Sequence, residues 1–403
     1  MARFSGLLVI AGILLLASCS KSIDKENGSV NNSENTNEKE SCDFGITQFN
    51  LSKRATVANE VSKGKPNNGS GSGGGTTSGG GTTGGTTSSS SVIYLDFDGQ
   101  SVSGTNWNLS VPFNCAPANI SATDADIILQ RVTLDYAPFN VAVTTNEAVY
   151  NAANLSKRIR VIVTESWEWY GQAGGTSYIN SFTWGNNTPC FVFSSLLGYN
   201  VKKIAEACSH EAGHTLGLRH QSSYDASGVK LDEYNWGQGS GEIGWAPIMG
   251  ASYNENLSLW HYGPSSVSST TMQDDVAKIA AVVGFAPDDY SNTTAGAAVL
   301  STSKTGIINS STDVDFFSVS LPVSKTVLLT PSNVGANNEG GNLDMVLNVY
   351  SSQGVLISSI NDPSKLSAGV TLPAGNYYVS AGTIDNQFAN RYGMLGKYSI
   401  NVN

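Results

Sequence analysis

The eleven residues from His210 to His220, HEAGHTLGLRH, constrain this chain more than any other stretch. Residues four apart in a helix share a face, so the imidazoles of His210 and His214 can reach one cation. Glu211 then lies beside that cation and can polarise a water molecule held there. Gly217 allows the helix to end abruptly, because glycine adopts backbone conformations that other residues resist. The chain can then turn back and bring His220 in as a third ligand. Three protein ligands leave one tetrahedral position open, which is typical of catalytic rather than structural zinc.

A chance occurrence is the alternative reading of this pattern. A bare H-E-x-x-H arises on ordinary helices, and a lone histidine is more often structural than a ligand. The chain has only four histidines, however, and three of them stand at the required offsets. Roughly 30 residues further on, PIMG (residues 247–250) stands where this signature expects a methionine turn. We therefore predict that His210, His214 and His220 bind one zinc ion, with Met249 as an apolar floor that does not ligate it.

The two motifs resemble those of metzincins, the zinc endopeptidases that include serralysins, astacins, matrixins and reprolysins. The segment from Val92 to Pro287 is similar to secreted bacterial metzincins of the reprolysin-like kind. That similarity rests on VIYLDFDG (92–99), DYAPFNVAVTT (135–145) and GWAPIMG (244–250). The resemblance implies an α+β catalytic domain over residues 92–287, with a twisted mixed sheet and long helices. It also implies peptide-bond hydrolysis through a zinc-activated water, with Glu211 as general base and then general acid.

The sequence departs from part of that family after the methionine. Astacins and serralysins carry a tyrosine two residues later, which can ligate zinc and stabilise the oxyanion, but this chain has Ala251 there. The departure favours a four-coordinate site. Tyr253 is a candidate transition-state stabiliser, and a purely structural tyrosine is the alternative. The resemblance further implies an extended substrate paired with an edge strand near Phe191 to Phe193, and the loop from Gln221 to Ile243 is long enough to shape specificity.

The amino terminus predicts an export signal over residues 1–18. Arg3 precedes an apolar run from Leu7 to Ala17 that is too short to span a bilayer comfortably. The sequence Leu16-Ala17-Ser18-Cys19 resembles a bacterial lipobox, with cleavage before Cys19 and lipid on its thiol. An ordinary signal peptide with a coincidental cysteine is the alternative. Diacylation plus an N-terminal acyl chain gives lasting membrane attachment. We therefore expect an exported bacterial lipoprotein of the cell envelope, at the outer membrane or cell surface, or an extracellular protein.

Residues 19–91 predict a tether, because 20–66 are polar and poor in aromatics and 64–91 are almost entirely Gly, Ser and Thr. Without Cys19, four cysteines remain in an oxidising compartment and allow three pairings. The metzincin resemblance favours Cys190 with Cys208, because a strand end and the zinc helix are neighbours in that fold, and Cys42 with Cys115 would follow. An alternative use of Cys42 is to cap the zinc as a thiolate in a latent form, although residues 40–43 do not closely match the cysteine-switch motif.

Short β-rich runs between turn residues predict an all-β sandwich or jelly roll over residues 288–403. The stretches DVDFFSVSLP (313–322) and LPAGNYYVSAG (372–382) resemble the bacterial pre-peptidase carboxy-terminal domain. Such modules bind substrate or polysaccharide, or serve export. Asp313 and Asp315 either lie near a structural calcium ion, as in related collagen-binding modules, or are turn-forming aspartates, which is the more common role.

The charge and the motifs together restrict the function. A net charge of −10 offers no basic surface for phosphate neutralisation, so nucleic acid is not an expected partner. The leading hypothesis is a monomeric, lipid-anchored zinc endopeptidase that acts on protein or peptide. One alternative is a surface protein that binds glycan or matrix on a metzincin scaffold, and the intact Glu211 argues against it. Another is a zinc amidase that acts on a non-protein amide, such as a peptidoglycan crosslink.

Overall fold

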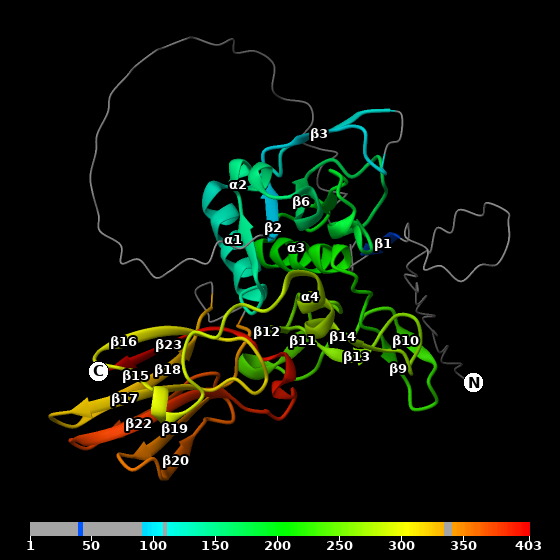
Figure 1. The fold of residues 1–403 in the computed structure, drawn as a ribbon. Coiled ribbons are helices and arrows are strands. Elements are labelled where there is room, and N and C mark those ends of the chain that lie inside the picture. The colour runs from blue at the N-terminus through cyan, green and yellow to red at the C-terminus, as the bar shows by residue number, and fades with distance from the viewer. Residues whose placement is uncertain (1–38, 43–90, 108–110, 334–340) are drawn as a thin grey trace, which may run out of the picture.

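The structure is a computed structural model that describes residues 39–42, 91–107, 111–333 and 341–403 (Figure 1). Over these ranges the protein is mostly β. Its helices are few: α1 (Ala122–Asp135), α2 (Glu147–Ala152), α3 (Val201–Thr215) and α4 (Asp275–Val283). The expected signal peptide, the expected lipidation site Cys19 and most of the expected tether lie outside the described residues. None of the helices in the described ranges has both the length and the apolar character needed to cross a membrane.

The amino-terminal half is built on a six-stranded mixed sheet with the order β1-β7-β8-β6-β2-β5. Its strands are β1 (Lys39–Cys42), β2 (Ser91–Asp96), β5 (Val141–Thr144), β6 (Arg158–Thr164), β7 (Gly175–Tyr178) and β8 (Cys190–Phe193). The strands β5, β2, β6 and β8 run parallel, whereas β7 is antiparallel to β8 and β1 is antiparallel to β7. Strands β2 and β8 are buried along their whole length, as expected for parallel strands covered on both faces.

Two longer helices pack on this sheet and on each other. Helix α1 begins after Ser121, whose side chain accepts a hydrogen bond from the Asp124 amide. Helix α3 begins after Asn200, which caps the Lys203 amide in the same way. In Figure 1, α1 and α3 stand between the sheet and the rest of the molecule. Helix α3 ends where Gly217 adopts a φ of +98°, a left-handed conformation that glycine reaches without strain.

Short strand pairs fill the segments between the main elements. A strand precedes α4, because Met272–Asp274 forms β14 and pairs antiparallel with β13 (Tyr262–Pro264). Asp274 then caps the Ala277 amide at the start of α4. The other pairs are β3 (Gln100–Val102) with β4 (Phe113–Cys115), β9 (Ser223–Tyr224) with β10 (Lys230–Asp232), and β11 (Trp245–Pro247) with β12 (Leu257–Leu259). Strands of two or three residues show no periodicity that a sequence could reveal.

The carboxy-terminal half is a β sandwich of two sheets, ordered β15-β17-β22-β19-β20 and β16-β23-β18-β21. Its strands are β15 (Ala298–Val299), β16 (Ser303–Ile308), β17 (Asp315–Leu321), β18 (Lys325–Pro331), β19 (Met345–Ser351), β20 (Leu356–Ile360), β21 (Ala368–Leu372), β22 (Gly375–Thr383) and β23 (Gly396–Val402). Inward side chains of both sheets share one core, with Phe317 and Leu347 from the first and Leu329 and Ile400 from the second. The sandwich lies below the helices in Figure 1.

The two halves are joined by buried polar contacts as well as apolar ones. Asn342 donates hydrogen bonds from Nδ2 to Asp135 Oδ1 at 2.9 Å and to the Ser258 carbonyl at 2.7 Å. The Phe388 carbonyl accepts hydrogen bonds from the side chains of Gln238 and Trp245. One hydrophobic cluster includes residues of both halves. The sandwich is therefore packed against the sheet-and-helix half and is not connected to it by the chain alone.

Both disulfides expected from the sequence are wrong, because Cys115, Cys190 and Cys208 are free thiols. Cys190 and Cys208 are fully buried and pack as small apolar side chains in one cluster. Burial raises the pKa of the Cys115 thiol to about 12 and that of the Cys190 thiol well above its usual value, which keeps both protonated. Neighbouring elements bring cysteines into one core without providing the separation and direction of Cβ atoms that a disulfide requires.

Candidate metal centre

The structure brings His210, His214 and His220 together. A ring nitrogen of each lies within 4.8 Å of one from each of the others, and the Nε2 atoms of His210 and His214 are 3.0 Å apart. Helix α3 places His210 and His214 one turn apart, and the turn at Gly217 returns the chain so that His220 faces them. All three side chains are buried, with at most 1% exposed. The cluster therefore offers converging nitrogen ligands shielded from bulk water.

The second nitrogen of each imidazole is held by an oxygen. The Nδ1 atoms of His210, His214 and His220 lie 2.7, 2.8 and 2.9 Å from Ile248 O, Leu218 O and Glu233 Oε1. Carbonyl and carboxylate oxygens only accept, so each Nδ1 carries a proton, and a neutral ring then presents a lone pair at Nε2. Burial, and then the neighbouring rings, lower the pKa of His210 and His214 well below the usual value. Neutral rings with lone pairs facing one another repel unless a cation lies between them, and this donor set fits Zn²⁺.

Glu211 lies fully buried next to the histidines, and strand β7 holds its carboxylate. Ser177 Oγ is 2.6 Å from Glu211 Oε2 and 2.9 Å from the Glu211 carbonyl oxygen. A Cβ added at Gly175 would lie 2.6 Å from Glu211 Oε1. The strand can approach the carboxylate this closely only because residue 175 is glycine. The catalytic candidate and strand β7 are thus in direct contact.

Met249 lies under the histidine motif. It is fully buried, and a Cβ added at Gly213, within the motif, would lie 2.7 Å from Met249 Sδ. The carbonyl of Met249 accepts a hydrogen bond from the Gln221 amide at 2.7 Å, and the preceding carbonyl is the one that holds His210. The methionine turn therefore supports both the helix ligands and the segment that carries His220.

Several residues to which sequence analysis assigned no role hold the His220 segment in place. Glu233 accepts from His220 and also pairs with Lys230 at 2.7 Å. Burial opposes the charged form, but the hydrogen bonds from His220 and Lys230 outweigh it and lower the pKa of Glu233. The side chain of Gln273 bonds both the amide and the carbonyl of Arg219. No short-range signal marks these residues, because their contacts depend on the paths of loops.

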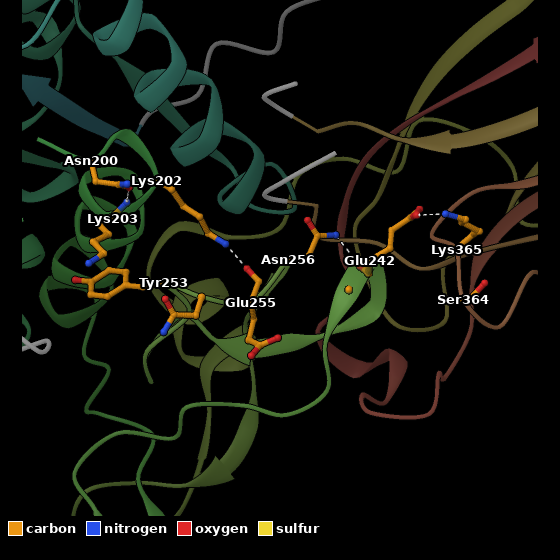
Figure 2. A pocket seen from close by; sticks show the side chains of 11 residues that line it. Asn200, Lys202, Lys203, Glu242, Tyr253, Glu255, Asn256, Ser364 and Lys365 are labelled. Atoms are coloured by element: carbon orange, nitrogen blue, oxygen red, sulfur yellow. Dashed lines mark hydrogen bonds and ion pairs between the residues drawn. The ribbon is translucent and has the colours of Figure 1, made fainter. Parts of the chain in front are cut away.

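The structure gives Tyr253, the predicted transition-state stabiliser, a basic neighbour. Its ring lies 5.8 Å from Lys203 Nζ, near the start of α3, about two helical turns from His210. Figure 2 shows it lining a cavity of about 780 Å³ together with Lys202, Lys203 and Glu255. An aromatic neighbour of the histidines is Tyr234, whose ring centroid is 4.7 Å from that of His220.

The expected substrate edge near Phe191 to Phe193 is wrong. The segment Phe191 to Phe193 belongs to β8, which lies between β6 and β7, so it cannot be the edge that a substrate strand would meet. Strand β7 borders the site, and β1 pairs along its other side. His261, which fits no motif, packs with its ring centroid 5.0 Å from that of Trp245, and burial lowers its pKa to about 4.

A second group of potential metal ligands lies in the β sandwich. Asp288, Asp313 and Asp315 each place one carboxylate oxygen within 4.8 Å of the others. Asp315 is fully buried and Asp313 is 5% exposed, and Oδ1 of each has no hydrogen-bond partner among the described residues. Burial, reinforced by neighbouring carboxylates, raises the pKa of Asp313 to about 6 and that of Asp315 to about 8. Buried carboxylate oxygens left without donors fit a hard, oxygen-seeking cation.

Comparison with known proteins adds little to this geometry. No protein-family model matches the chain, and no curated protein sequence matches it. The pre-peptidase C-terminal domain of a Bacillus anthracis collagenase is 15% identical, with a TM-score of 0.20, over 29% of this chain and 98% of that one. A periplasmic inhibitor of g-type lysozyme from Aeromonas hydrophila is 12% identical, with a TM-score of 0.17, over 26% of this chain and 88% of that one. Likenesses this weak establish neither a fold nor a function.

Proposed function

We propose that this protein is a zinc-dependent endopeptidase of the metzincin kind, exported and lipid-anchored through Cys19. One observation carries the proposal: three buried imidazoles converge beside the buried carboxylate of Glu211. A scaffold that only binds glycan or matrix has no use for ligands and base in one place. The sequence around Cys19 supports the anchor.

His210, His214 and His220 would hold the ion. A zinc ion bound there acts as a Lewis acid on the scissile carbonyl and lowers the pKa of coordinated water. The oxygens that hold the three Nδ1 atoms fix the tautomer and the direction of each ring. Such partners raise the basicity of the ligating nitrogens.

Glu211 supplies the acid–base chemistry. Its carboxylate takes a proton from the attacking water and returns a proton to the departing amine, a role that contributes about 10²–10⁴-fold to the rate. The Ser177 hydroxyl, 2.6 Å from Oε2, orients the carboxylate. Because the side chain is fully buried, bulk water does not compete for it in the absence of substrate.

An extended peptide is the substrate class that this site fits. Strand β7 touches Glu211 through Ser177 and Gly175, so a peptide paired along β7 would bring its backbone carbonyls to the site. Main-chain pairing can bind any extended peptide. A non-protein substrate with a single amide has no strand-like backbone and would gain no binding energy from such pairing. The geometry therefore favours a peptidase over an amidase acting on a non-protein amide.

The test is chelator-sensitive release of peptides from denatured protein by the exported chain. Glu211→Ala should lower kcat/KM by at least about 10²-fold while zinc stays stoichiometric, and His214→Ala should lose the metal. Glu255→Ala removes a carboxylate beside the cavity of Figure 2 and serves as the control with normal activity. An active Glu211→Ala chain, or a folded chain that takes up no zinc, would contradict the proposal.

We also propose that Asp288, Asp313 and Asp315 bind a structural calcium ion. The raised pKa values of Asp313 and Asp315 mean that, without a cation, the folded state prefers them protonated. Their contribution to stability is then present at low pH and is lost as the pH rises through about 6 to 8.

In chelator the Tm should therefore fall between pH 5 and pH 8, and calcium should restore it at pH 8. Asp315→Asn should abolish the calcium response, while Asp362→Asn, at an exposed turn, should keep it.

A further inference from the structure

We propose that the cavity of Figure 2 binds an acidic sugar, one whose ring carries a carboxylate as well as hydroxyl groups. The cavity has a volume of about 780 Å³, within the range of about 300–1,000 Å³ that is typical of small-molecule sites. It lies where the two halves of the protein meet, because the start of α3, residues 241–242 and 253–256, and residues 364–365 of the sandwich all line it. The inference uses neither the histidines nor Glu211 and does not depend on the proposed peptidase function.

Two lysines make part of the cavity attractive to an anion. Lys202 and Lys203 lie in the first turn of α3, where the helix dipole adds a partial positive charge. Lys202 Nζ donates to the backbone carbonyl of Glu255, and Lys203 Nζ lies 5.8 Å from the centre of the Tyr253 ring. Within the described ranges, neither lysine forms an ion pair with a carboxylate. A carboxylate that enters the cavity would therefore meet two ammonium groups that are not already paired with one.

The rest of the lining fits hydroxyl groups. Glu242 and Glu255 bring carboxylates to the cavity, and Lys365 of the sandwich pairs with Glu242 at 2.8 Å. Carboxylates accept hydrogen bonds from hydroxyl groups but repel dense negative charge. Neutral side chains that can both donate and accept complete the lining: Asn200, Asn254, Asn256 and Ser364. This mixture fits a polyhydroxylated ring with one carboxylate better than a phosphate or a sulfate.

The backbone around the cavity favours a sugar over an acidic peptide. The lining residues belong to the start of α3, to the short 3-10 helix Gly241–Ile243 and to loops, and none of them is part of a strand. An extended peptide would therefore find no strand edge in this lining to pair with. Figure 2 shows Lys203 and Tyr253 at one end of the cavity and Lys365 and Ser364 at the other. A short oligomer of acidic sugar rings would bind along this line of side chains.

The test is isothermal titration calorimetry of the full chain with trigalacturonate, in calcium-free buffer at low ionic strength. The fully methyl-esterified trisaccharide is the matched neutral ligand, because it differs only at the carboxylates. The acid should bind about tenfold more tightly than the ester or better, the typical effect of a hydrogen bond to a charged group, and added salt should reduce this preference. Equal affinity for the two ligands, or no binding of the acid, would overturn the inference.

A pair of variants tests the position of the site. Lys202→Gln/Lys203→Gln should weaken binding of trigalacturonate about tenfold or more. Lys304→Gln/Lys325→Gln removes the same charge from two sandwich lysines that do not line the cavity, and it should bind like the parent chain. Equal losses in the two variants would mean that only the overall charge of the protein matters, and the site would be refuted.

Thermal unfolding provides a second measurement. A ligand that binds only the folded state raises the Tm, so trigalacturonate should raise the Tm of the parent chain and of Lys304→Gln/Lys325→Gln. It should not raise that of Lys202→Gln/Lys203→Gln, whose own transition without ligand shows whether that variant is folded. A Tm rise of equal size in all three chains would contradict the proposal. Tighter binding of triglutamate than of trigalacturonate would show that the cavity takes an acidic peptide and would overturn the assignment to a sugar.

Discussion

The second nitrogen of each histidine decides how well the cluster can hold a metal, and for His220 that contact is the carboxylate of Glu233. Glu233→Ala should weaken zinc binding by about 10–100-fold, because the ring loses the acceptor that fixes its tautomer and direction. Competition with a chromogenic chelator measures the change. Lys230→Ala is the matched control, since it removes the other partner of the same carboxylate. Equal losses in the two variants would show that only the charge of the loop matters.

Ser177 acts on the base rather than on the ligands. Its hydroxyl lies 2.6 Å from Glu211 Oε2, so Ser177→Ala should lower kcat about tenfold, the typical loss of one hydrogen bond to a charged group, and leave zinc content unchanged. Ser194→Ala provides the comparison, because that buried hydroxyl bonds the Ala118 carbonyl at 2.8 Å, away from the histidines. It should lower the free energy of unfolding without lowering kcat. A normal kcat for Ser177→Ala would remove the orienting role.

Single residues also show where sequence reasoning succeeds and where it stops. His210, His214 and Glu211 could be placed because helix geometry alone fixes their relation. Tyr253 is a candidate stabiliser only because it stands four residues after Met249. A separation along the chain does not determine the direction in which a side chain points. Ser252 and Ser258 both bond the carboxylate of Glu206 in α3. This anchors the segment after the methionine near the first half of the helix, where the Tyr253 ring lies beside Lys203.

At the scale of elements, α3 and the methionine turn fit because residue 213 has no side chain. Alanine in a helix is normally more stable than glycine by about 0.5–1 kcal/mol. Here its Cβ would lie 2.7 Å from Met249 Sδ, and such overpacking costs about 1–3 kcal/mol. Gly213→Ala should therefore lower the free energy of unfolding, whereas in a Met249→Ala background the same change should be neutral or stabilising. A double-mutant cycle by urea unfolding tests this, and additive effects would mean that the two residues do not meet.

The elements that could be predicted are those with their own periodicity. The apolar spacing of α1 and the apolar run of β8 give each a recognisable pattern that burial then satisfies. Strand β1 could not be predicted, because KESC shows no alternation and has weak strand propensity. It is extended only through its pairing with β7. The start of α4 is hard to predict for a similar reason, because the three residues before it form a strand that pairs with β13.

At the scale of the whole molecule, a polar contact links the β sandwich to helix α3. Asp135 accepts from Asn342 of the sandwich and from Ser209, the residue before His210. Burial, and then the nearby Glu206 carboxylate, raise the pKa of Asp135 to about 8, and the hydrogen bonds from Ser209 and Asn342 oppose this rise. Removal of the sandwich would take away the Asn342 donor and uncover the apolar surface around it. The two halves thus share a buried polar contact and a hydrophobic cluster, although their strand patterns differ.

That continuity predicts a single cooperative unfolding transition for the full chain in calorimetry, with equal calorimetric and van't Hoff enthalpies. Asn342→Ala should lower the free energy of unfolding by about 1–3 kcal/mol, because it leaves a buried carboxylate oxygen short of a donor. Asn348→Ala, which removes a 3.3 Å hydrogen bond to Ser380 inside the sandwich, should cost less and leave the shape of the transition unchanged. If the full chain instead melted in two separate steps, with Asn342→Ala moving only the step of the sandwich, the sandwich would be an independent module. An amino-terminal half comprising residues 92–287 alone should, on the present geometry, give little folded protein, because the apolar surface that the sandwich covers would be exposed and Asp135 would lose the Asn342 donor.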